Sequence, residues 1–369
     1  MFSLGIVGMP NVGKSTLFNA LTRSHSPAEN FPFCTIEPNI GVVAIPDPRL
    51  EAIAEVIQPE KLTPAVVQFV DIAGLVRGAS TGEGLGNQFL AHIREVDAIV
   101  QVVRCFSDSN ITHVEGSVDP VRDAKTVELE LLLADMATVA NRKEKTARML
   151  KTGEERYRRE MAWLEELEAL LDSGKPARML RTTSQEHAQW LSQLFLLTAK
   201  PVLYAANVDE DWLIADETEP LAPLEELRAY AREQGSEVVT VSARIEAELM
   251  EMDPEEAAAF QSELGISELS LGKLVTASYQ LLDLLSFYTV KGPETRAWSI
   301  KRGTKAPQAA GKIHTDMEKG FIRAEVVSYK DLLQQGSFAA ARDQGLVRSE
   351  GKDYEIADGD VVLFRFNVS

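Results

Sequence analysis

Several kinds of residue and segment are scarce in this chain of 369 residues. It has two cysteines, Cys34 and Cys105, too few for a disulfide framework or a four-cysteine zinc site. No apolar run approaches the ~18–20 residues that cross a bilayer. The first eight residues have no basic segment and no small-residue cleavage site, so no signal peptide is expected. These absences favour a globular protein of the reducing cytoplasm without a membrane partner.

Positive charge is also in short supply. The chain has 38 lysines and arginines against 56 aspartates and glutamates, a net charge of −18. Such a chain is not expected to coat nucleic acid, and we expect no DNA partner. Basic residues nevertheless gather at 156–159 and 301–305. Phosphate contacts from these clusters would bring the protein to RNA, although a solvated helix face explains the first cluster equally well.

What the chain does contain is a series of short, apolar, β-branched runs with helical stretches between them. They lie at residues 4–7, 66–70, 98–103 and 201–206, with a weaker one at 237–241. Such runs are typical of strands buried on both faces of a parallel sheet. The alternation predicts an α/β domain over residues 1–280.

Residues 122–172 interrupt this alternation. Apolar residues recur there at three- and four-residue steps among many charges. The spacing predicts two long amphipathic helices, antiparallel and joined near residues 151–153. Because predicted strands flank them, they form an insertion of about residues 122–200 in the first domain.

Residues 281–369 change character again and predict a small α+β domain. Strand-like runs at 287–290 and 297–300 flank a turn and predict a hairpin. A strong terminal strand is expected at 359–366, and one short helix at 329–335.

Residues 8–15, Gly-Met-Pro-Asn-Val-Gly-Lys-Ser, fit the pattern G-x-x-x-x-G-K-[ST] between a predicted strand and a predicted helix. Gly8 and Gly13 let the backbone curl so that successive N–H groups face one anion. Lys14 neutralises the β- and γ-phosphates and is the expected catalytic cation, while Ser15 offers its hydroxyl to Mg²⁺. The residues expected to contact the nucleotide here are Asn11, Val12, Gly13, Lys14, Ser15 and Thr16.

Two further segments complete the expected phosphate site. Asp71 ends the second predicted strand and begins a D-x-x-G motif, whose Gly74 can offer its N–H to a γ-phosphate. Thr35 lies in the loop between the first helix and the second strand, where its hydroxyl can join the Mg²⁺ shell. The predicted metal ligands are therefore Ser15, Thr35 and Asp71.

The segment after the strand at 201–206 departs from the N-K-x-D pattern that reads guanine. It is Asn207-Val208-Asp209-Glu210, so valine replaces the lysine that packs on the purine and the carboxylate is one methylene longer. An asparagine amide and a backbone carbonyl suit adenine instead. Ser242 and Ala243 follow the next strand and are expected to close over the base. We predict ATP in preference to GTP, with contacts from Asn207, Val208, Glu210, Ser242 and Ala243.

Leu75 stands where a Ras-type enzyme has the glutamine that orients the attacking water. Either hydrolysis is slow or another group orients the water, and His113 is the best candidate in the sequence. The carboxamide of Asn11 could help to bind K⁺ beside the phosphates, or it could simply stiffen the loop.

Together, residues 8–16, 31–39 and 71–76 resemble the YchF-type Obg-like ATPases, P-loop GTPase-fold proteins of the translation-factor class. The resemblance spans the whole chain. It implies an α/β P-loop NTPase domain with a mostly parallel sheet, the inserted antiparallel helical hairpin and a C-terminal ubiquitin-like β-grasp domain of the TGS type. It also implies preference for ATP, a hydrophobic residue in place of the catalytic glutamine, and a link to ribosomes and stress responses.

Two other functions remain open from the sequence. Leu75 is compatible with an adaptor that binds nucleotide and scarcely turns it over. A true GTPase is the third reading, which competition between ATP and GTP would separate.

Overall fold

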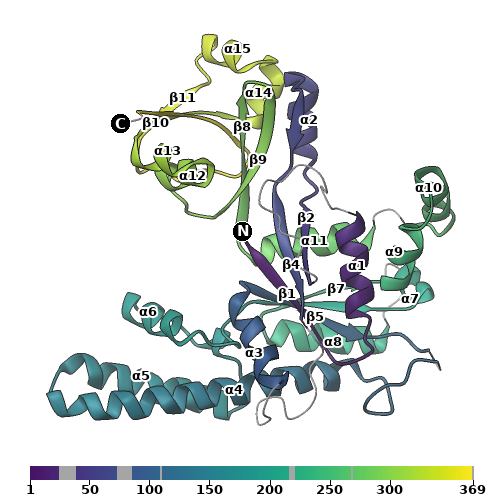
Figure 1. Cartoon of the computed structure of the whole chain (residues 1–369), viewed down its shortest axis with the longest axis vertical. Coiled ribbons are helices and arrows are strands. Elements are labelled where there is room, and N and C mark those ends of the chain that lie inside the picture. The colour runs from purple at the N-terminus through teal and green to yellow at the C-terminus, as the bar shows by residue number, and fades with distance from the viewer. Residues whose placement is uncertain (25–38, 73–84, 109, 216–220, 267–268, 368–369) are drawn as a thin grey trace. The chain divides into compact units, whose positions relative to one another are not determined.

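The structure, a computed structural model, describes residues 1–24, 39–72, 85–108, 110–215, 221–266 and 269–367 (Figure 1). The chain forms two compact units. One comprises Met1–Val42 and Gln68–Ser278, and the other comprises Val43–Val67 and Tyr279–Ser369. The division differs from the two contiguous domains expected at residues 1–280 and 281–369, because residues 43–67 pack with the C-terminal residues.

A six-stranded sheet forms the centre of the first unit, in the order β2-β4-β1-β5-β6-β7. The strands are β1 (Ser3–Val7), β2 (Ile40–Ala44), β4 (Val66–Asp71), β5 (Ala98–Arg104), β6 (Val202–Asn207) and β7 (Glu237–Val241). The pairs β1–β4, β1–β5, β5–β6 and β6–β7 are parallel. Every residue of β5 and β6 is buried, as continuous apolar runs in a covered parallel sheet predict. The predicted α/β fold is confirmed.

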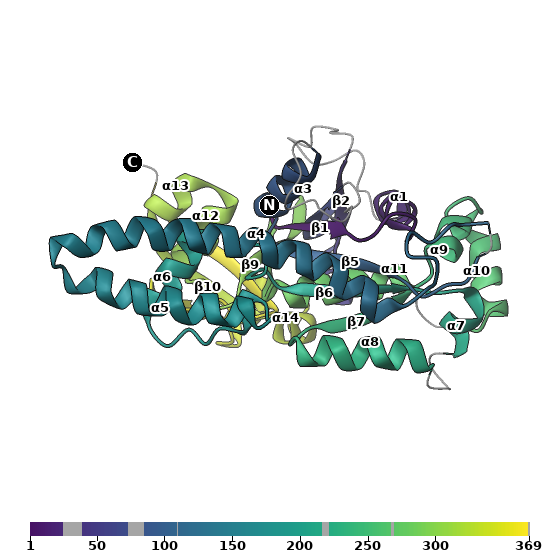
Figure 2. The same cartoon turned by 90° about the horizontal axis from the view of Figure 1, so that it is seen from below.

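Helices lie on both faces of this sheet. Figures 1 and 2 show α11 on one face and α4 and α8 on the other. The helices of the core of this unit are α1 (Lys14–Ser24), α3 (Leu85–Glu95), α7 (Glu210–Ala215), α8 (Ala222–Glu233), α9 (Ala243–Leu249), α10 (Pro254–Glu263) and α11 (Ser270–Leu281). Because β1, β5, β6 and β7 are parallel, the loops that follow them meet at one edge of the sheet. That edge carries the site described below.

The predicted helical insertion is present as α4 (Pro120–Met149) and α5 (Glu155–Asp172), followed by α6 (Gln185–Leu194) (Figure 2). The carboxylate of Asp119 accepts a hydrogen bond from the Arg122 N–H at the start of α4, and Pro120 occupies the first helical position. A 3₁₀ turn at Leu150–Thr152 and Gly153, with φ of 78°, reverse the chain. The apolar seam that joins these helices includes Leu132, Val139, Trp163, Leu164, Leu167, Leu171, Trp190 and Leu194.

The second unit is built on a sheet with the order β11-β10-β12-β8-β9-β3. Its strands are β3 (Lys61–Thr63), β8 (Leu284–Lys291), β9 (Glu294–Lys301), β10 (Phe321–Ser328), β11 (Arg348–Glu350) and β12 (Asp360–Phe366). β8 and β9 form the predicted hairpin, and β12 pairs in parallel with β8 and antiparallel with β10. Without β3, this order is that of the predicted β-grasp. β3 extends the sheet by pairing in parallel with β9.

The helices of the second unit exceed the sequence prediction. They are α2 (Pro48–Ile57), α12 (Ala306–Ile313), α13 (Thr315–Lys319), α14 (Tyr329–Gln335) and α15 (Phe338–Asp343). The expected helix at 329–335 is α14, but the expectation of a single helix after residue 281 is wrong. α12 has Pro307 in its first turn, where proline is favoured. Gly311 lies in its interior, where glycine is a poor helix former, yet Ala306, Ala309 and Ala310 are fully buried in the core. Tertiary packing therefore outweighs local propensity here.

Among the described residues, no helix combines the length and apolar character that crossing a membrane requires.

Candidate functional site

The loop between β1 and α1 has the backbone that a phosphate-binding loop needs. Gly8 has φ of 153° and Gly13 has φ of 96°, and Asn11 is left-handed with φ of 61°. A Cβ on Gly8 would lie 2.5 Å from the Val102 carbonyl oxygen, and one on Gly13 would overlap the amide nitrogen of Asn207. Both glycines are thus required by space as well as by conformation. The loop leads directly into the N-terminus of α1, where an anion is favoured.

Lys14 is the first residue of α1 and is only 8% exposed. Its Nζ donates a hydrogen bond to the carbonyl oxygen of Met9, at 2.8 Å. Burial lowers the pKa of Lys14, while the negative charge of Asp71 acts in the opposite direction. The ammonium group is therefore held over the loop by a neutral carbonyl, a partner that an incoming phosphate oxygen can replace.

Ser15 and Asp71 lie together beside this loop. The Ser15 hydroxyl donates to Asp71 Oδ2 at 3.1 Å, and Asp71 sits at the end of β4, next to β1. Asp71 Oδ1 is buried and has no hydrogen-bond partner among the described residues. A hydroxyl beside a carboxylate with one unpaired buried oxygen suits Mg²⁺, which prefers oxygen ligands. The residues present therefore fit the predicted metal.

Two residues predicted to act here, Thr35 and Gly74, lie outside the described residues, and so does Leu75.

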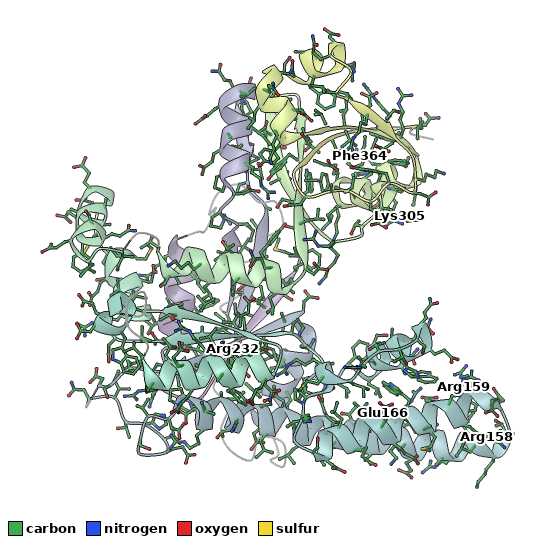
Figure 3. All side chains as sticks on the ribbon, turned by 180° about the vertical axis from the view of Figure 1, so that it is seen from behind. Arg158, Arg159, Glu166, Arg232, Lys305 and Phe364 are labelled. Atoms are coloured by element: carbon green, nitrogen blue, oxygen red, sulfur yellow. The ribbon has the colours of Figure 1, made fainter. Side chains whose placement is uncertain are left out.

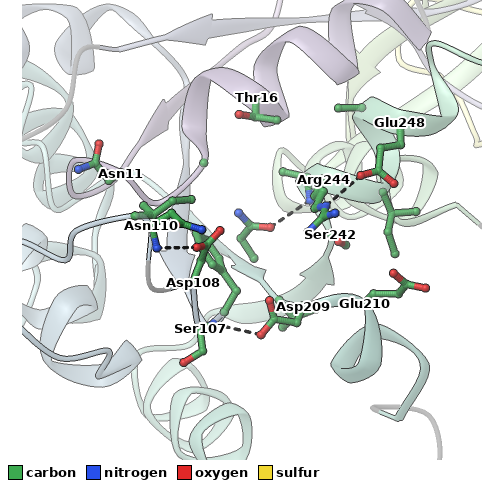
Figure 4. A pocket seen from close by; sticks show the side chains of 18 of the residues that line it. Asn11, Thr16, Ser107, Asp108, Asn110, Asp209, Glu210, Ser242, Arg244 and Glu248 are labelled. Atoms are coloured by element: carbon green, nitrogen blue, oxygen red, sulfur yellow. Dashed lines mark hydrogen bonds and ion pairs between the residues drawn. The ribbon is translucent and has the colours of Figure 1, made fainter.

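A pocket of about 880 Å³ opens beside the phosphate loop (Figure 4). It has the size of a typical small-molecule site. Eight of the predicted nucleotide-binding residues line it: Asn11, Gly13, Thr16, Asn207, Val208, Glu210, Ser242 and Ala243. The structure thus brings together residues that are up to 232 positions apart in the chain, counting from Asn11 to Ala243.

Asn207 ties two of these segments together. Its side-chain Nδ2 donates to the Val12 carbonyl oxygen at 2.9 Å, and its Oδ1 accepts from the Ala243 N–H at 3.0 Å. Asn207 is buried, with 5% exposed. The residue therefore positions the phosphate loop against the start of α9. One N–H of its amide and the second lone pair of Oδ1 are left for a base.

The neighbours of Asn207 depart from a guanine-reading site in their geometry as well as in their identity. Val208 is 3% exposed and presents little surface to a purine. Asp209 Oδ2 accepts a hydrogen bond from the Ser107 N–H at 3.0 Å, so this carboxylate faces the loop after β5. Glu210 begins α7 and is exposed. Adenine reading by this segment stays a prediction.

Asn11 faces a neighbouring loop. Its Nδ2 donates to the Thr112 carbonyl oxygen at 3.2 Å, which leaves its Oδ1 as the atom that could ligate K⁺.

The structure does not place the His113 ring in the pocket. The side chain is 6% exposed. Its Nδ1 accepts from the Glu115 N–H at 3.1 Å, so the ring hydrogen lies on Nε2, which is 2.7 Å from Asp123 Oδ2. This corrects the expectation that His113 stands ready to orient water, because both ring nitrogens are bonded within the protein. Catalysis by His113 would require the ring to leave Asp123.

Sequence reasoning missed one part of this site. Phe106, Ser107, Asp108, Asn110 and Ile111 also line the pocket. These residues form no known motif, so the only sign in the sequence that they could line a site is the length of the loop that follows β5.

The two basic clusters are largely paired within the protein. Figure 3 shows Arg158 and Arg159 on α5. Arg158 pairs with Glu155, and Arg159 pairs with Glu186. Their neighbour Arg156 stacks on the Tyr157 ring at 5.1 Å.

In the second cluster Arg302 pairs with Asp283, and Lys305 pairs with Asp353. Lys301 Nζ donates to the Leu282 carbonyl oxygen. Exposed pairs of this kind contribute little to stability and exchange readily for other anions.

Comparison with known proteins supports the fold. A profile described as a 50S ribosome-binding GTPase matches residues 3–142. A second, for the C-terminal domain of YchF GTPases and described as a protein of unknown function, matches residues 284–367.

Curated relatives match nearly the full length of the chain. The ribosome-binding ATPase YchF of Bacillus subtilis is 51% identical over 366 residues, 99% of each chain. Its namesake from Escherichia coli O157:H7 is 48% identical, over 100% of this chain and 99% of the relative. The solved structure of the Schizosaccharomyces pombe YchF GTPase is 38% identical, covers 99% of this chain and 97% of its own, and superimposes with a TM-score of 0.88. By sequence identity, coverage and fold, the chain belongs to the YchF family of P-loop proteins.

Proposed function

We propose that this protein is a ribosome-associated P-loop ATPase that hydrolyses ATP slowly and acts as a nucleotide-dependent switch. The observation that carries the proposal is the arrangement of Lys14, Ser15 and Asp71 around a loop whose backbone suits phosphate. The relatives that match the full chain are named ribosome-binding ATPases.

At the phosphate end of the pocket, different residues have different roles. Lys14 and the backbone N–H groups of the loop hold the phosphates and stabilise charge that develops there. Ser15, Asp71 and Thr35 hold Mg²⁺, which when bound neutralises phosphate charge. Gly74 senses the γ-phosphate through its N–H. Because Leu75 cannot orient water, turnover without a partner is slow. K⁺ held by Asn11 would add positive charge beside the phosphates.

Preference for ATP is supported by the base end of the pocket. A guanine-reading site has an aspartate at the fourth position of N-K-x-D, and here that position is Glu210, whose carboxylate is one methylene longer. The position of the lysine that would pack on the purine is taken by Val208, which is buried.

A GTPase remains the second candidate, because the Schizosaccharomyces pombe relative is named a GTPase. Equilibrium competition separates the two. We expect ATP to displace bound ADP at a concentration at least tenfold below that of GTP. Equal displacement by GTP would defeat the proposed preference.

The proposed partner is the ribosome or its RNA, which would place the protein in the cytoplasm. A role in translation or in stress responses would follow from the nucleotide state. Contacts between the basic clusters and RNA phosphates would depend on salt. We expect ribosomes to speed single-turnover ATP hydrolysis. An unchanged, negligible rate with ribosomes would favour a nucleotide-binding adaptor instead.

A charge-matched pair of variants tests the helical cluster. Arg156→Gln with Arg158→Gln should weaken ribosome pelleting and flatten its salt dependence. Arg181→Gln with Arg232→Gln removes the same charge from other exposed positions and should leave pelleting unchanged. Equal behaviour of the two pairs would exclude this contact surface.

A further inference from the structure

Residues of the loop after β5 form one side of the nucleotide pocket. We call Phe106, Ser107, Asp108, Asn110 and Ile111 the pocket wall. Figure 4 shows the bond from Ser107 to Asp209 and the bond between Asp108 and Asn110, with Ser242 and Arg244 on the opposite side of the pocket. None of these wall residues belongs to the phosphate loop or to the segment after β6, so the wall is a separate element of the site.

The buried side chain of Arg104 makes hydrogen bonds to the backbone of the pocket wall. Arg104 is the last residue of β5 and is 2% exposed. Its guanidinium donates to three wall carbonyls: those of Phe106 at 3.2 Å, Ile111 at 3.0 Å and Asp108 at 3.2 Å. Its Cζ also lies 4.4 Å from the centre of the Phe106 ring.

The burial of this guanidinium indicates a specific role. Within the described part of the chain Arg104 makes hydrogen bonds to neutral carbonyls and no ion pair. A buried charge without an opposite charge is costly and is rarely kept for stability alone. Because Arg104 bonds carbonyls from both ends of the wall, it holds those carbonyls in one arrangement.

Two further bonds tie the same loop to the rest of the site. Asp209 Oδ2 accepts from the Ser107 N–H at 3.0 Å. Asn11 Nδ2 donates to the carbonyl of Thr112, the residue after the wall, at 3.2 Å. The wall is thus joined to the base segment at one end and to the phosphate loop at the other.

We propose that the pocket wall is the third side of the site for the base and ribose, and that Asp209 and Arg104 are positioning residues that hold it. The proposal rests on nucleotide binding at this pocket, as proposed above. It gives a role to Asp209, which stands one position before the guanine-reading position of the motif and bonds the wall. Adenine nucleotide bound here contacts the wall, and the wall keeps its shape only while both residues hold it.

Calorimetric titration of the full-length protein with Mg²⁺ and ADP tests the role of Asp209. Asp209→Ala removes the acceptor for Ser107 and should weaken ADP binding about tenfold, the size expected for a hydrogen bond to a charged group. Asp209→Asn keeps an acceptor oxygen and should recover affinity to within about threefold. Hydrogen exchange supplies a second readout, since the Ser107 amide should exchange faster in Asp209→Ala and regain its rate in Asp209→Asn.

Arg104→Met tests the buried cation, with Arg178→Met as the matched control. Arg178 is likewise poorly exposed, pairs with Glu128 at 2.7 Å, and lies outside the pocket. Both variants should lower thermal stability, but only Arg104→Met should weaken ADP binding, by at least about tenfold. Equal loss of affinity in the two variants would show an effect of stability alone and would overturn the proposal.

The outcomes separate this proposal from the proposed function. If the unmodified protein binds neither ADP nor GDP, the proposed function fails. If it binds ADP, and Asp209→Ala binds equally tightly with unchanged exchange at Ser107, only the role of the wall is overturned.

Discussion

The two ends of the nucleotide pocket are built in different ways. At the phosphate end, a run of eight consecutive residues sets the backbone, and its positive-φ glycines and its lysine come from one loop. At the base end, Asn207, Asp209 and Arg104 each bond a segment that is distant in the sequence or lies across a loop. One end is therefore a local motif, and the other depends on the tertiary fold.

This difference has consequences for how each end fails. Damage to the phosphate end should abolish binding of every nucleotide, because backbone N–H groups recognise phosphate and not base. A single substitution at the base end should weaken binding only in part, since several side chains contribute to it. The following predictions test that contrast.

Gly13→Ala should have the largest effect. An alanine at this position would have to adopt the positive φ of 96° that Gly13 has, and its Cβ would overlap the side chain of Asn207. We expect loss of detectable nucleotide binding and a destabilisation of about 2–4 kcal/mol, measured by calorimetry and by denaturant unfolding. Gly153→Ala is the control, because its φ of 78° is similar but nothing lies within 4 Å of the added Cβ. That control should bind nucleotide normally.

Asn207→Ala should rank second, since it breaks bonds to both Val12 and Ala243. Each lost bond leaves a buried backbone group unpaired, and we expect about 2 kcal/mol of destabilisation and at least about tenfold weaker ADP binding. Asn207→Asp keeps the acceptor for the Ala243 N–H but loses the donor to Val12. Because that carboxylate would set a buried negative charge against the Val12 carbonyl oxygen, the affinity of Asn207→Asp should be no higher than that of Asn207→Ala. If Asn207→Ala bound ADP with normal affinity, the base end of the pocket would not depend on the hydrogen bonds of Asn207 to Val12 and Ala243.

Asp71→Asn should change the metal dependence more than the nucleotide affinity. The neutral amide keeps an acceptor for Ser15 but removes the charge beside Mg²⁺. We expect about tenfold more Mg²⁺ to be needed for half-maximal ATP binding. Titration of Mg²⁺ at fixed ATP measures this shift, with binding in excess chelator as the reference. An unchanged Mg²⁺ midpoint would rule out Asp71 as part of the metal site.

Asn11→Gly should have the smallest effect. Glycine tolerates the φ of 61° seen at Asn11, so the loop keeps its shape and ADP affinity should stay within about threefold. If Asn11 helps to hold K⁺, any stimulation of hydrolysis by K⁺ over Na⁺ should disappear in this variant. Stimulation that persists unchanged would leave Asn11 only as a loop-stiffening residue.

The same contrast explains how much could be predicted from the sequence. The strands around β1, β4, β5, β6 and β7 and the helical hairpin follow from local apolar periodicity, and the phosphate loop follows from a short motif. All of these were predictable because each depends on neighbours in the chain.

Features that depend on distant neighbours were not predictable. β3 pairs with β9, from Lys61 with Glu294 onward, and no local pattern indicates such a partner. The buried ring of His113 depends on Asp123, and the orientation of Asp209 depends on Ser107. In each case a hydrogen bond formed by the fold decides what a recognisable residue does.

Nucleotide binding by Lys14→Ala tests the central claim most directly. The account predicts that the unmodified protein binds ATP with Mg²⁺ and that removal of this buried ammonium group lowers the affinity at least about a hundredfold, with the folded structure retained. Calorimetric titration of both proteins, with circular dichroism as the check on folding, provides the comparison. Equal affinity in the folded Lys14→Ala protein would contradict the account.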